Sequence, residues 1–413
     1  YAGLRHMLAV RAATPELDGA DLIGFDAGSE HLVAYQRPGL DPEGRPSVIL
    51  CLANVSEESV RVEALTLSGF EPEATSLLAE HPHDSLEEAA LALLPQLVGS
   101  FCLSFMDEHT LYAARDPQGI RPLVLGRLER GWVVASETAA LDIVGASFVR
   151  DIEPGEMVAI DETGVHSERF AETPKAHCVF EYVYVARPDS VIDGQTVNAS
   201  RIEIGRRLSK VNPVEADLVM PVPESGTPAA IGYAEASGIP FKQGMMKNAY
   251  VGRTFIQPSD TLRQLGLRLK LNPVREVIEG KKLVVVDDSI VRGNTQRKLI
   301  RMLREAGAAE VHVRIASPPV KWPCFYGIDF ASPGELIANH GRTDSDEAIA
   351  ESIRTMIGAD SLAFVPIDDM IAASHKPKDN LCAACFTGHY PLGLPEGNPN
   401  ADLVRRIQKG AEA

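Results

Sequence analysis

Two adjacent carboxylates, Asp287 and Asp288, follow a short apolar run that is rich in β-branched residues. The run, Leu283 to Val286, is too short for a helix and is typical of a buried parallel strand. A polar turn through Gly293 leads into a segment with helical spacing of apolar residues, which Gly307 closes. The N–H groups of such a turn attract an anion, and carboxylates at a strand end can hold sugar hydroxyls or hydrated Mg²⁺. The stretch therefore predicts a phosphate site in an α/β sheet, with an ordinary strand-to-helix corner as the alternative.

A second strand-turn-helix pattern lies earlier in the chain. Its apolar strand, Leu218 to Val222, runs into the turn Pro-Glu-Ser-Gly, and Gly238 ends the helix that follows. The hydroxyl of Ser225 and the free amides of this turn suit a pyrophosphate group or its Mg²⁺. Taken alone, the turn is better explained as a plain connection. Together with the first site, it indicates a second anion site.

Basic residues are concentrated between these two turns. The segment, which glycines and a proline loosen, contains Lys247, Arg253, Arg263, Arg268, Lys270 and Arg275. The whole chain has a formal net charge of −17, so a site for a polyanionic substrate requires such a local excess of cations. A long basic loop that orders over a pyrophosphate would exclude water and neutralise the leaving group. A solvated basic face is the alternative explanation.

Four cysteines form the other chemically competent group. Cys382 and Cys385 make a C-x-x-C pair in a loop, while Cys324 and Cys178 stand in separate segments. Four thiolates, two of them from one tight loop, can bind a [4Fe–4S] cluster or a tetrahedral Zn²⁺ ion. The residues alone leave both metals open, with unligated thiols as a third interpretation. His177, next to Cys178, is expected to be a bystander.

Composition limits the class of protein. A chain of 413 residues can hold two or three domains with sizeable cores. Its acidity argues against a nucleic-acid groove or an anionic membrane surface, and no apolar run approaches membrane-spanning length. No signal peptide is visible, and six cysteines in so long a chain indicate a reduced, cytoplasmic setting. Because residue 1 is Tyr, we expect the numbering to start inside a longer or processed chain.

Residues 1–75 differ from the rest of the chain. A short amphipathic helix is expected over residues 4–10. Alternating runs broken by Pro and Gly predict a small antiparallel β segment, over residues 31–36, 47–54 and 60–67. The pieces LAVRAATPEL, LVAYQR and VILCLANVS resemble the C-terminal β-domain of amylosucrase and trehalose-synthase glycosidases, which carries no catalytic residues. A generic small β-sandwich is the alternative.

Residues 76–175 show helical periodicity followed by strands. The segments RDPQGIRPLVLG and WVVASETAALD, within residues 115–142, resemble the latter half of the glutaminase domain of glutamine phosphoribosylpyrophosphate (PRPP) amidotransferases. The resemblance implies a truncated α+β domain of the N-terminal-nucleophile type. Such a glutaminase needs an N-terminal Cys, an Asn-Gly oxyanion hole and a glutamine-clamping Arg before the matched stretch. The first cysteine is Cys51, expected like Cys102 to be a packed core thiol, so we expect an inactive glutaminase half and the use of free ammonia.

The same resemblance is nearly continuous from Ala176 to about Pro391. It is carried by HCVFEYVYVARPDS, by ADLVMPVPESGTPAAIGYAEASGIP and by KKLVVVDDSIVRGNT. It implies an α/β fold: a type I phosphoribosyltransferase domain, with a parallel sheet flanked by helices, over residues 176–370. A C-terminal segment over residues 371–413 would carry the C-x-x-C pair and a brief helix over 402–409. In the iron–sulfur branch of the family, a structural [4Fe–4S] cluster is held by cysteines at the places of Cys178, Cys324, Cys382 and Cys385.

The resemblance also implies roles for individual residues. The Mg²⁺ contacts would be Ser225, Asp287 and Asp288. The PRPP contacts would be Asp287, Asp288, Ser289, Arg292, Gly293, Asn294, Thr295, Glu224, Ser225, Gly226 and Lys247. The cations that stabilise the charge developing on pyrophosphate would be Arg253, Arg263, Arg268 and Lys270.

The function implied is that of an amidophosphoribosyltransferase, a pentosyltransferase of purine synthesis. Ammonia, which the family takes from glutamine, would displace pyrophosphate from PRPP and give 5-phosphoribosylamine. We expect Mg²⁺ and a [4Fe–4S] cluster as cofactors, purine nucleotides as inhibitors, a homodimer or homotetramer, and no nucleic-acid or membrane partner. The alternatives are a non-catalytic regulator that binds PRPP or a nucleotide, a salvage phosphoribosyltransferase that accepts a base, and carbohydrate binding by residues 1–75.

Overall fold

The computed structural model describes residues 85–107, 109–248, 271–328, 330, 332–340 and 345–409, together with the backbone of three strands nearer the N-terminus. The chain divides into two compact units. The first comprises residues 1–97, 103–113 and 157–170, and the second comprises residues 98–102, 114–156 and 171–413. The helix expected over 4–10 and the run over 60–67 lie outside the described residues.

Three antiparallel strands open the first unit: β1 (Ile23–Phe25), β2 (Leu32–Leu40) and β3 (Pro46–Asn54). Two of the predicted runs are thereby confirmed as paired strands. The run predicted over residues 31–36 ends too early, because β2 continues through Pro38 and Gly39 to Leu40, opposite Pro46. β1 pairs only with residues 34–36 of β2, so among the described strands Pro38 has a neighbour on one side only, which is β3. A proline, which has no N–H to donate, is tolerated at such an edge position.

A four-stranded sheet follows, in the order β10-β9-β5-β4. Its strands are β4 (Cys102–Met106), β5 (Leu111–Arg115), β9 (Glu156–Asp161) and β10 (Gly164–Arg169). Helix α3 (Leu86–Leu93) precedes them, and Ser85 begins it by accepting the N–H of Glu88 at 3.2 Å. The predicted change from helix to strands after residue 76 is confirmed over the described part.

A second small sheet belongs to the other unit. Strands β6 (Val124–Arg127), β7 (Trp132–Ala135) and β8 (Ser147–Asp151) are antiparallel, with helix α4 (Thr138–Ile143) between the last two. The chain before β6 is held by the Arg115 guanidinium, which donates to the carbonyls of Arg121 at 2.8 Å and Ile152 at 2.7 Å.

The centre of the second unit is a parallel sheet in the order β14-β17-β18-β19. Its strands are β14 (Leu218–Pro221), β17 (Lys282–Asp287), β18 (Glu310–Ile315) and β19 (Ser361–Phe364). Val284 and Val286 of β17 pack into one apolar cluster, while Leu283 and Val285 pack into another. The sheet is therefore buried on both faces, as the apolar run before Asp287 predicted.

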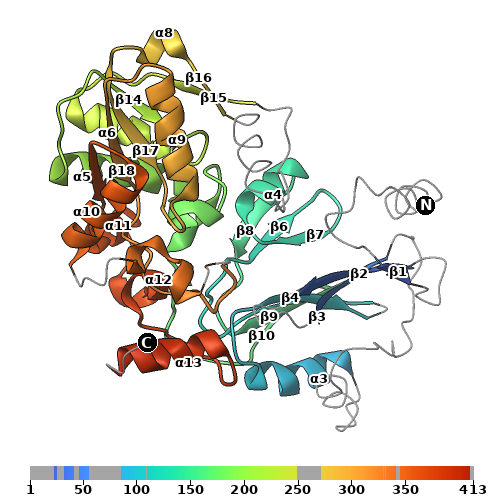
Figure 1. Ribbon diagram of the computed structural model, residues 1–413. Coiled ribbons are helices and arrows are strands. Elements are labelled where there is room, and N and C mark those ends of the chain that lie inside the picture. The colour runs from blue at the N-terminus through green and yellow to red at the C-terminus, as the bar shows by residue number, and fades with distance from the viewer. Residues whose placement is uncertain are drawn as a thin grey trace. The chain divides into compact units, whose positions relative to one another are not determined.

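Helices cover both faces of this sheet (Figure 1). Helices α5 (Val197–Val211), α6 (Thr227–Ser237) and α11 (Ile367–Ala373) contribute to the cluster that contains Val284. Helices α9 (Asn294–Glu305) and α10 (Asp346–Ile357) contribute to the cluster that contains Val285. Gly238 and Gly307, the predicted helix ends, directly follow α6 and lie just beyond α9, both with positive φ. The predicted parallel sheet flanked by helices is confirmed.

Shorter elements complete the second unit. They are β11 (His177–Cys178), β12 (Val191–Ile192), β13 (Gln195–Thr196), β15 (Met245–Lys247), β16 (Leu271–Pro273), α8 (Arg275–Ile278), β20 (Leu381–Cys382), α12 (Ala384–Thr387) and α13 (Pro399–Gln408). A π-helical turn spans Glu181–Val185, and 3-10 turns span residues 333–335, 337–339 and 378–380, while a further 3-10 turn at residues 94–96 belongs to the first unit. The last helix starts before the predicted Asp402 because Asn398 caps it, accepting the N–H of Ala401 at 3.1 Å. Among the described residues, no helix is long and apolar enough to cross a membrane.

Candidate active site

The acidic pair stands at the carboxyl edge of the parallel sheet. Asp287 is the last residue of β17, and both it and Asp288 are 7% exposed. The Asp287 carboxylate accepts the N–H of Asp288 at 2.9 Å and the side-chain amide of Gln296 in α9. The Ser289 hydroxyl donates to Asp288 at 2.5 Å. Burial and the adjacent Asp288 carboxylate raise the pKa of Asp287 well above its ordinary value, so a bound cation would stabilise the ionised pair.

The turn after the acids leads into α9 without a side-chain cap. Gly293 precedes the helix with φ 74°, and a Cβ at this position would clash with the side chain of Ile337. The N–H of Ile337 donates to the Val291 carbonyl at 2.9 Å. This hydrogen bond attaches the turn to the segment that contains Ile337. The neighbouring residues are exposed: Arg292, Asn294 and Thr295. The first N–H groups of α9, which have no partner within the helix, can therefore meet an anion.

The second turn lies directly against the end of β17, the strand that leads into the first turn. β14 and β17 are neighbours in the sheet, with Pro221 opposite Val286. The N–H of Val222 donates to the Val286 carbonyl at 2.8 Å. A Cβ on Gly226 would clash with that same carbonyl and would stand 3.2 Å from the Cα of Asp287. Only a glycine lets the 222–227 turn approach so closely, so the fold brings both predicted anion turns to one edge.

Other predicted residues gather at this corner. Ser225 is half-buried and Glu224 is exposed, and the peptide bond between Pro223 and Glu224 is cis. The Nζ of Lys247, at the end of β15, lies 3.7 Å from the Glu224 carboxylate. β15 pairs with β16, and the chain between these strands contains the predicted catalytic cations. These lie outside the described residues: Arg253, Arg263, Arg268 and Lys270.

Two residues of this region were not singled out by sequence reasoning. Gln296 is 3% exposed and donates its side-chain amide to Asp287. The sequence indicates this role only through the position of Gln296 on the buried face of α9. Arg201 of α5 is also 3% exposed and donates to the carbonyls of Tyr182 at 3.0 Å and Ala186 at 2.8 Å. Burial lowers the pKa of Arg201, and the negative charge of Asp288 opposes that shift. In the sequence, Arg201 could have been noticed as a charged residue at a position where this helix is otherwise buried.

The four cysteines that sequence analysis grouped lie close to one another. Cys178 in β11 is paired with Cys382 in the parallel strand β20. The Cys385 carbonyl accepts the N–H of Trp322 at 3.0 Å, which brings the segment of Cys324 beside α12. All four are free thiols, three of them buried and Cys324 partly so. Segments far apart in the sequence therefore supply one set of sulfur donors.

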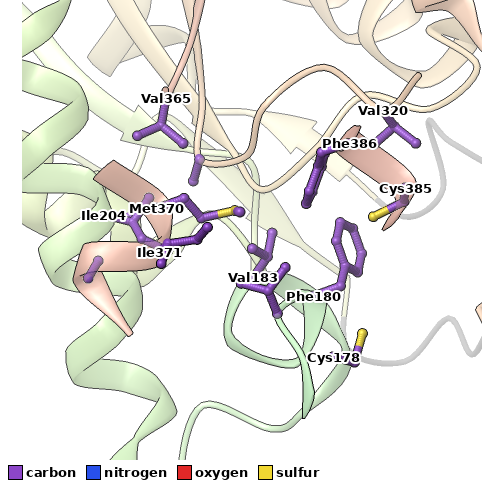
Figure 2. Close-up of a cluster of buried hydrophobic side chains, with 14 of the residues drawn as sticks. Cys178, Phe180, Val183, Ile204, Val320, Val365, Met370, Ile371, Cys385 and Phe386 are labelled. Carbon is purple, nitrogen blue, oxygen red and sulfur yellow. The ribbon is translucent and has the colours of Figure 1, made fainter. Parts of the chain in front are cut away.

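The surroundings of these thiols are apolar. Figure 2 shows Cys178 and Cys385 in a cluster of buried side chains with Phe180 and Phe386, whose ring centroids are 6.0 Å apart. Burial raises the pKa of Cys382 to about 11. Burial, and then the other three thiols, raise the pKa of Cys385 well above its ordinary value. A metal would be needed to stabilise all four as thiolates.

The four thiols are of the donor type that a [4Fe–4S] cluster or a Zn²⁺ ion takes. Within the described part of the chain, no three His, Cys, Asp or Glu side chains converge closely enough to hold a single metal ion. Around a [4Fe–4S] cluster each thiolate binds its own iron, so the sulfurs stand farther apart than around Zn²⁺. Four neighbouring free thiols in an apolar enclosure supply the number and type of donors that such a cluster takes.

The fold and the site define a class: a parallel α/β protein that presents two amide-rich turns and an acidic pair at one sheet edge. Residues 68–142 match the glutamine amidotransferase domain family. An amidophosphoribosyltransferase of Mycobacterium tuberculosis is 69% identical over 321 residues, which are 78% of this chain and 60% of that protein. One of Synechocystis is 44% identical over 393 residues, which are 92% of this chain and 77% of that protein.

A solved structure is similar as well. It is the glutamine PRPP amidotransferase of Bacillus subtilis complexed with ADP and GMP, with a TM-score of 0.73 and 45% identity, covering 81% of this chain and 73% of that one. The chain therefore belongs to the amidophosphoribosyltransferase family, which confirms the resemblance seen in the sequence. It spans 60% of the length of the mycobacterial relative.

Proposed function

We propose that the chain transfers a 5-phosphoribosyl group from PRPP to ammonia, in the first step of purine synthesis. The nitrogen lone pair forms a bond to C1 of the ribose as the bond from C1 to the pyrophosphate oxygen breaks, with inversion. The ammonium nitrogen then loses a proton and 5-phosphoribosylamine results. The observation that carries the proposal is the close approach of Gly226 to the end of β17, which sets both anion turns side by side. Family membership supports the same reaction.

In this proposal the first turn holds the sugar and its 5-phosphate. The N–H groups of residues 292–295, with the hydroxyl of Thr295, bind the phosphate at the uncapped start of α9. Asp287 and Asp288 orient the ribose hydroxyls from the sheet edge. Because Gln296 fixes the Asp287 carboxylate, the acidic pair is oriented before the substrate arrives.

The second turn holds the pyrophosphate in this proposal. Its amides, the hydroxyl of Ser225 and the ammonium of Lys247 face the leaving group. The ion pair between Lys247 and Glu224 is exposed, with 47% and 75% of the side chains accessible, and such pairs are weak. Lys247 can therefore exchange the Glu224 carboxylate for a more highly charged pyrophosphate.

Mg²⁺ is proposed as the metal at this edge, held by Asp287, Asp288 and Ser225. Mg²⁺ typically binds one or two carboxylates together with substrate phosphates and water. It therefore does not need the three converging protein ligands that are absent among the described residues. When bound, it would neutralise pyrophosphate oxygens as their charge develops.

The remaining catalytic contribution is assigned to cations between β15 and β16. The side chains proposed to stabilise the departing pyrophosphate are Arg253, Arg263, Arg268 and Lys270. No protein nucleophile is required at the sugar carbon, so catalysis consists of positioning and electrostatic stabilisation.

The same proposal includes a structural [4Fe–4S] cluster on the four cysteines and a cytoplasmic, homo-oligomeric protein. The neighbouring free thiols support the cluster. The Bacillus subtilis structure was solved with ADP and GMP, which supports purine nucleotides as inhibitors of this chain.

Pyrophosphate release from PRPP tests the function. We expect release that depends on ammonium and Mg²⁺, with Asp288→Asn slower by about a hundredfold. The control is Asp189→Asn, an exposed acid paired with Arg187, which should keep the full rate. PRPP binding without release would indicate a regulator, and consumption of a purine base would indicate a salvage enzyme. Glutamine in place of ammonium measures any remaining glutaminase activity.

A further inference from the structure

A short segment of the second unit, residues 333–339, lies against the turn that leads into α9. It contains two successive 3-10 turns, and in the chain it stands between β18 and α10. The proposed phosphoribosyl transfer uses none of its residues. We call residues 333–339 the supporting segment and residues 291–295 the phosphate turn.

Three consecutive residues of the phosphate turn contact the supporting segment. The carbonyl of Val291 accepts the N–H of Ile337 at 2.9 Å. The Arg292 guanidinium donates through Nε to the Glu335 carboxylate at 3.0 Å, and its Nη2 lies 3.0 Å from the same oxygen. A Cβ on Gly293 would overlap the Cδ1 of Ile337, so this methyl group lies close against the Gly293 backbone. Ile337 therefore contacts the turn through both its main chain and its side chain.

The supporting segment is itself fixed in place. Ile337 and Ala338 are 2% and 4% exposed and pack into the same apolar cluster as α9 and α10. The side-chain amide of Asn339 donates to the carbonyls of Lys321 at 3.0 Å and Pro333 at 2.8 Å. Side chains in a close-packed interior do not shift without cost. The segment therefore limits the positions that the phosphate turn can take.

This restriction matters because the phosphate turn would bind its anion through main-chain N–H groups, whose directions depend on the backbone conformation. Gly293, with φ 74°, is the residue of the turn whose own backbone is least restricted. A contact that holds Gly293 in one conformation lowers the cost of ordering the turn when the anion binds. The 5-phosphate does not react, so the support should act equally on the bound substrate and on the transition state.

We propose that Ile337 is a positioning residue for the 5-phosphate of PRPP. Its Cδ1 methyl group and its main-chain N–H hold the phosphate turn in the conformation that binds. The inference rests on the proposed function, in which this turn takes the 5-phosphate. Ile337 acts through Val291 and Gly293 and not on the substrate itself, so its loss should change the affinity for PRPP and leave the rate of the bound complex unchanged.

Ile337→Val tests the proposal, because it deletes only the methyl group that lies against Gly293. We expect the KM for PRPP to rise about threefold to tenfold while kcat stays the same. In calorimetric titration, ribose 5-phosphate should bind more weakly by the same factor. Pyrophosphate with Mg²⁺, which the proposed function assigns to the second turn, should bind as it does to the wild type.

The matched control is Ile278→Val in α8. Ile278 is 0% exposed and belongs to the same apolar cluster, but it precedes the start of β17, whereas the phosphate turn follows the end of that strand. The control loses the same methyl group and should keep the KM for PRPP and the affinities for both probes.

Each outcome decides the role of Ile337. Unchanged constants in Ile337→Val, a lower kcat with the same KM, or equal weakening of both probes would overturn the proposal, and so would a wild type that does not bind ribose 5-phosphate. A wild type that binds ribose 5-phosphate but releases no pyrophosphate would refute the proposed function, while the binding data would still test Ile337. If thermal unfolding shows that Ile337→Val is not folded, Asn339→Ala decides. It removes the amide that anchors the segment and should weaken ribose 5-phosphate binding in the same way.

Discussion

Cys178 lies directly opposite Cys382 in the parallel pair of two-residue strands β11 and β20. This pair joins the segment that precedes the α/β domain to the C-terminal C-x-x-C segment. The main-chain bond from Val179 to the Cys382 carbonyl, at 3.1 Å, fixes this register. Backbone pairing therefore positions two of the four sulfurs beside each other.

The cysteine set makes a prediction about metal content. Anaerobically purified protein should contain iron and acid-labile sulfide and absorb visible light. Cys178→Ser and Cys385→Ser should each abolish or strongly reduce all three, since each removes one thiolate ligand. The matched control is Cys102→Ser, a thiol outside the set that interacts with the carbonyl of Pro122 at 3.6 Å, and it should keep the cluster. Zinc without sulfide would contradict the cluster.

Gly226→Ala should damage both stability and activity. The added methyl group would overlap the Val286 carbonyl at the end of β17. We expect a loss of about 1–3 kcal/mol in the free energy of unfolding, and a large fall in pyrophosphate release because the two turns must separate. Urea unfolding and the PRPP assay measure the two effects.

Gly334→Ala is the control for that substitution. A Cβ added at Gly334 would meet no heavy atom of a non-neighbouring described residue within 4 Å, so the free energy of unfolding should change by less than about 0.5 kcal/mol. If both variants behaved alike, the close approach of the turns would not matter to the site.

Arg201→Met should be strongly destabilising. The guanidinium satisfies the carbonyls of Tyr182 and Ala186 in a buried region near the charge of Asp288. Its removal takes these donors from the two carbonyls and a positive charge from the surroundings of Asp288, so we expect a loss of about 3 kcal/mol. In the same helix, Arg206→Met breaks an exposed ion pair with Glu235 and should cost less than about 1 kcal/mol. Equal losses in urea unfolding would contradict the assignment.

Glu181 predicts a pH dependence of stability. Burial raises the pKa of this carboxyl to about 7, although Arg121 lies 3.0 Å away. Neither the facing nitrogen nor the oxygen makes an aligned hydrogen bond, so the ion pair does not offset the burial. The unfolded chain releases the proton near pH 4.5, so the free energy of unfolding should fall as the pH rises from 4.5 to 7 and then level off.

The variant Glu181→Gln checks this sign. In the wild type, the free energy of unfolding in urea should fall by on the order of 1–3 kcal/mol between pH 5 and pH 7.5. In Glu181→Gln this fall should be absent. An identical slope in the wild type and in the variant would show that other groups cause the dependence.

The sequence by itself determined the local units. The strand, the acids and the turn at residues 283–293 are contiguous, so residue order and β-branched composition were enough to predict them, and the same holds for Leu218 to Gly226. The family resemblance added residue roles because those motifs are also local. The sequence also grouped four cysteines, although spacing alone could not choose between a cluster and zinc.

Only the tertiary structure decided which distant residues meet. The contact of Gly226 with Val286, the hydrogen bond of Gln296 to Asp287 and the pairing of Cys178 with Cys382 all depend on how separate segments pack. The unpartnered Nε2 of His177 is likewise a property of its surroundings, whereas the sequence predicts only a bystander there. Periodicity reports which face of an element is buried. It does not report what that face is buried against, and burial against a particular partner is what sets the charge and hydrogen bonding of each of these groups.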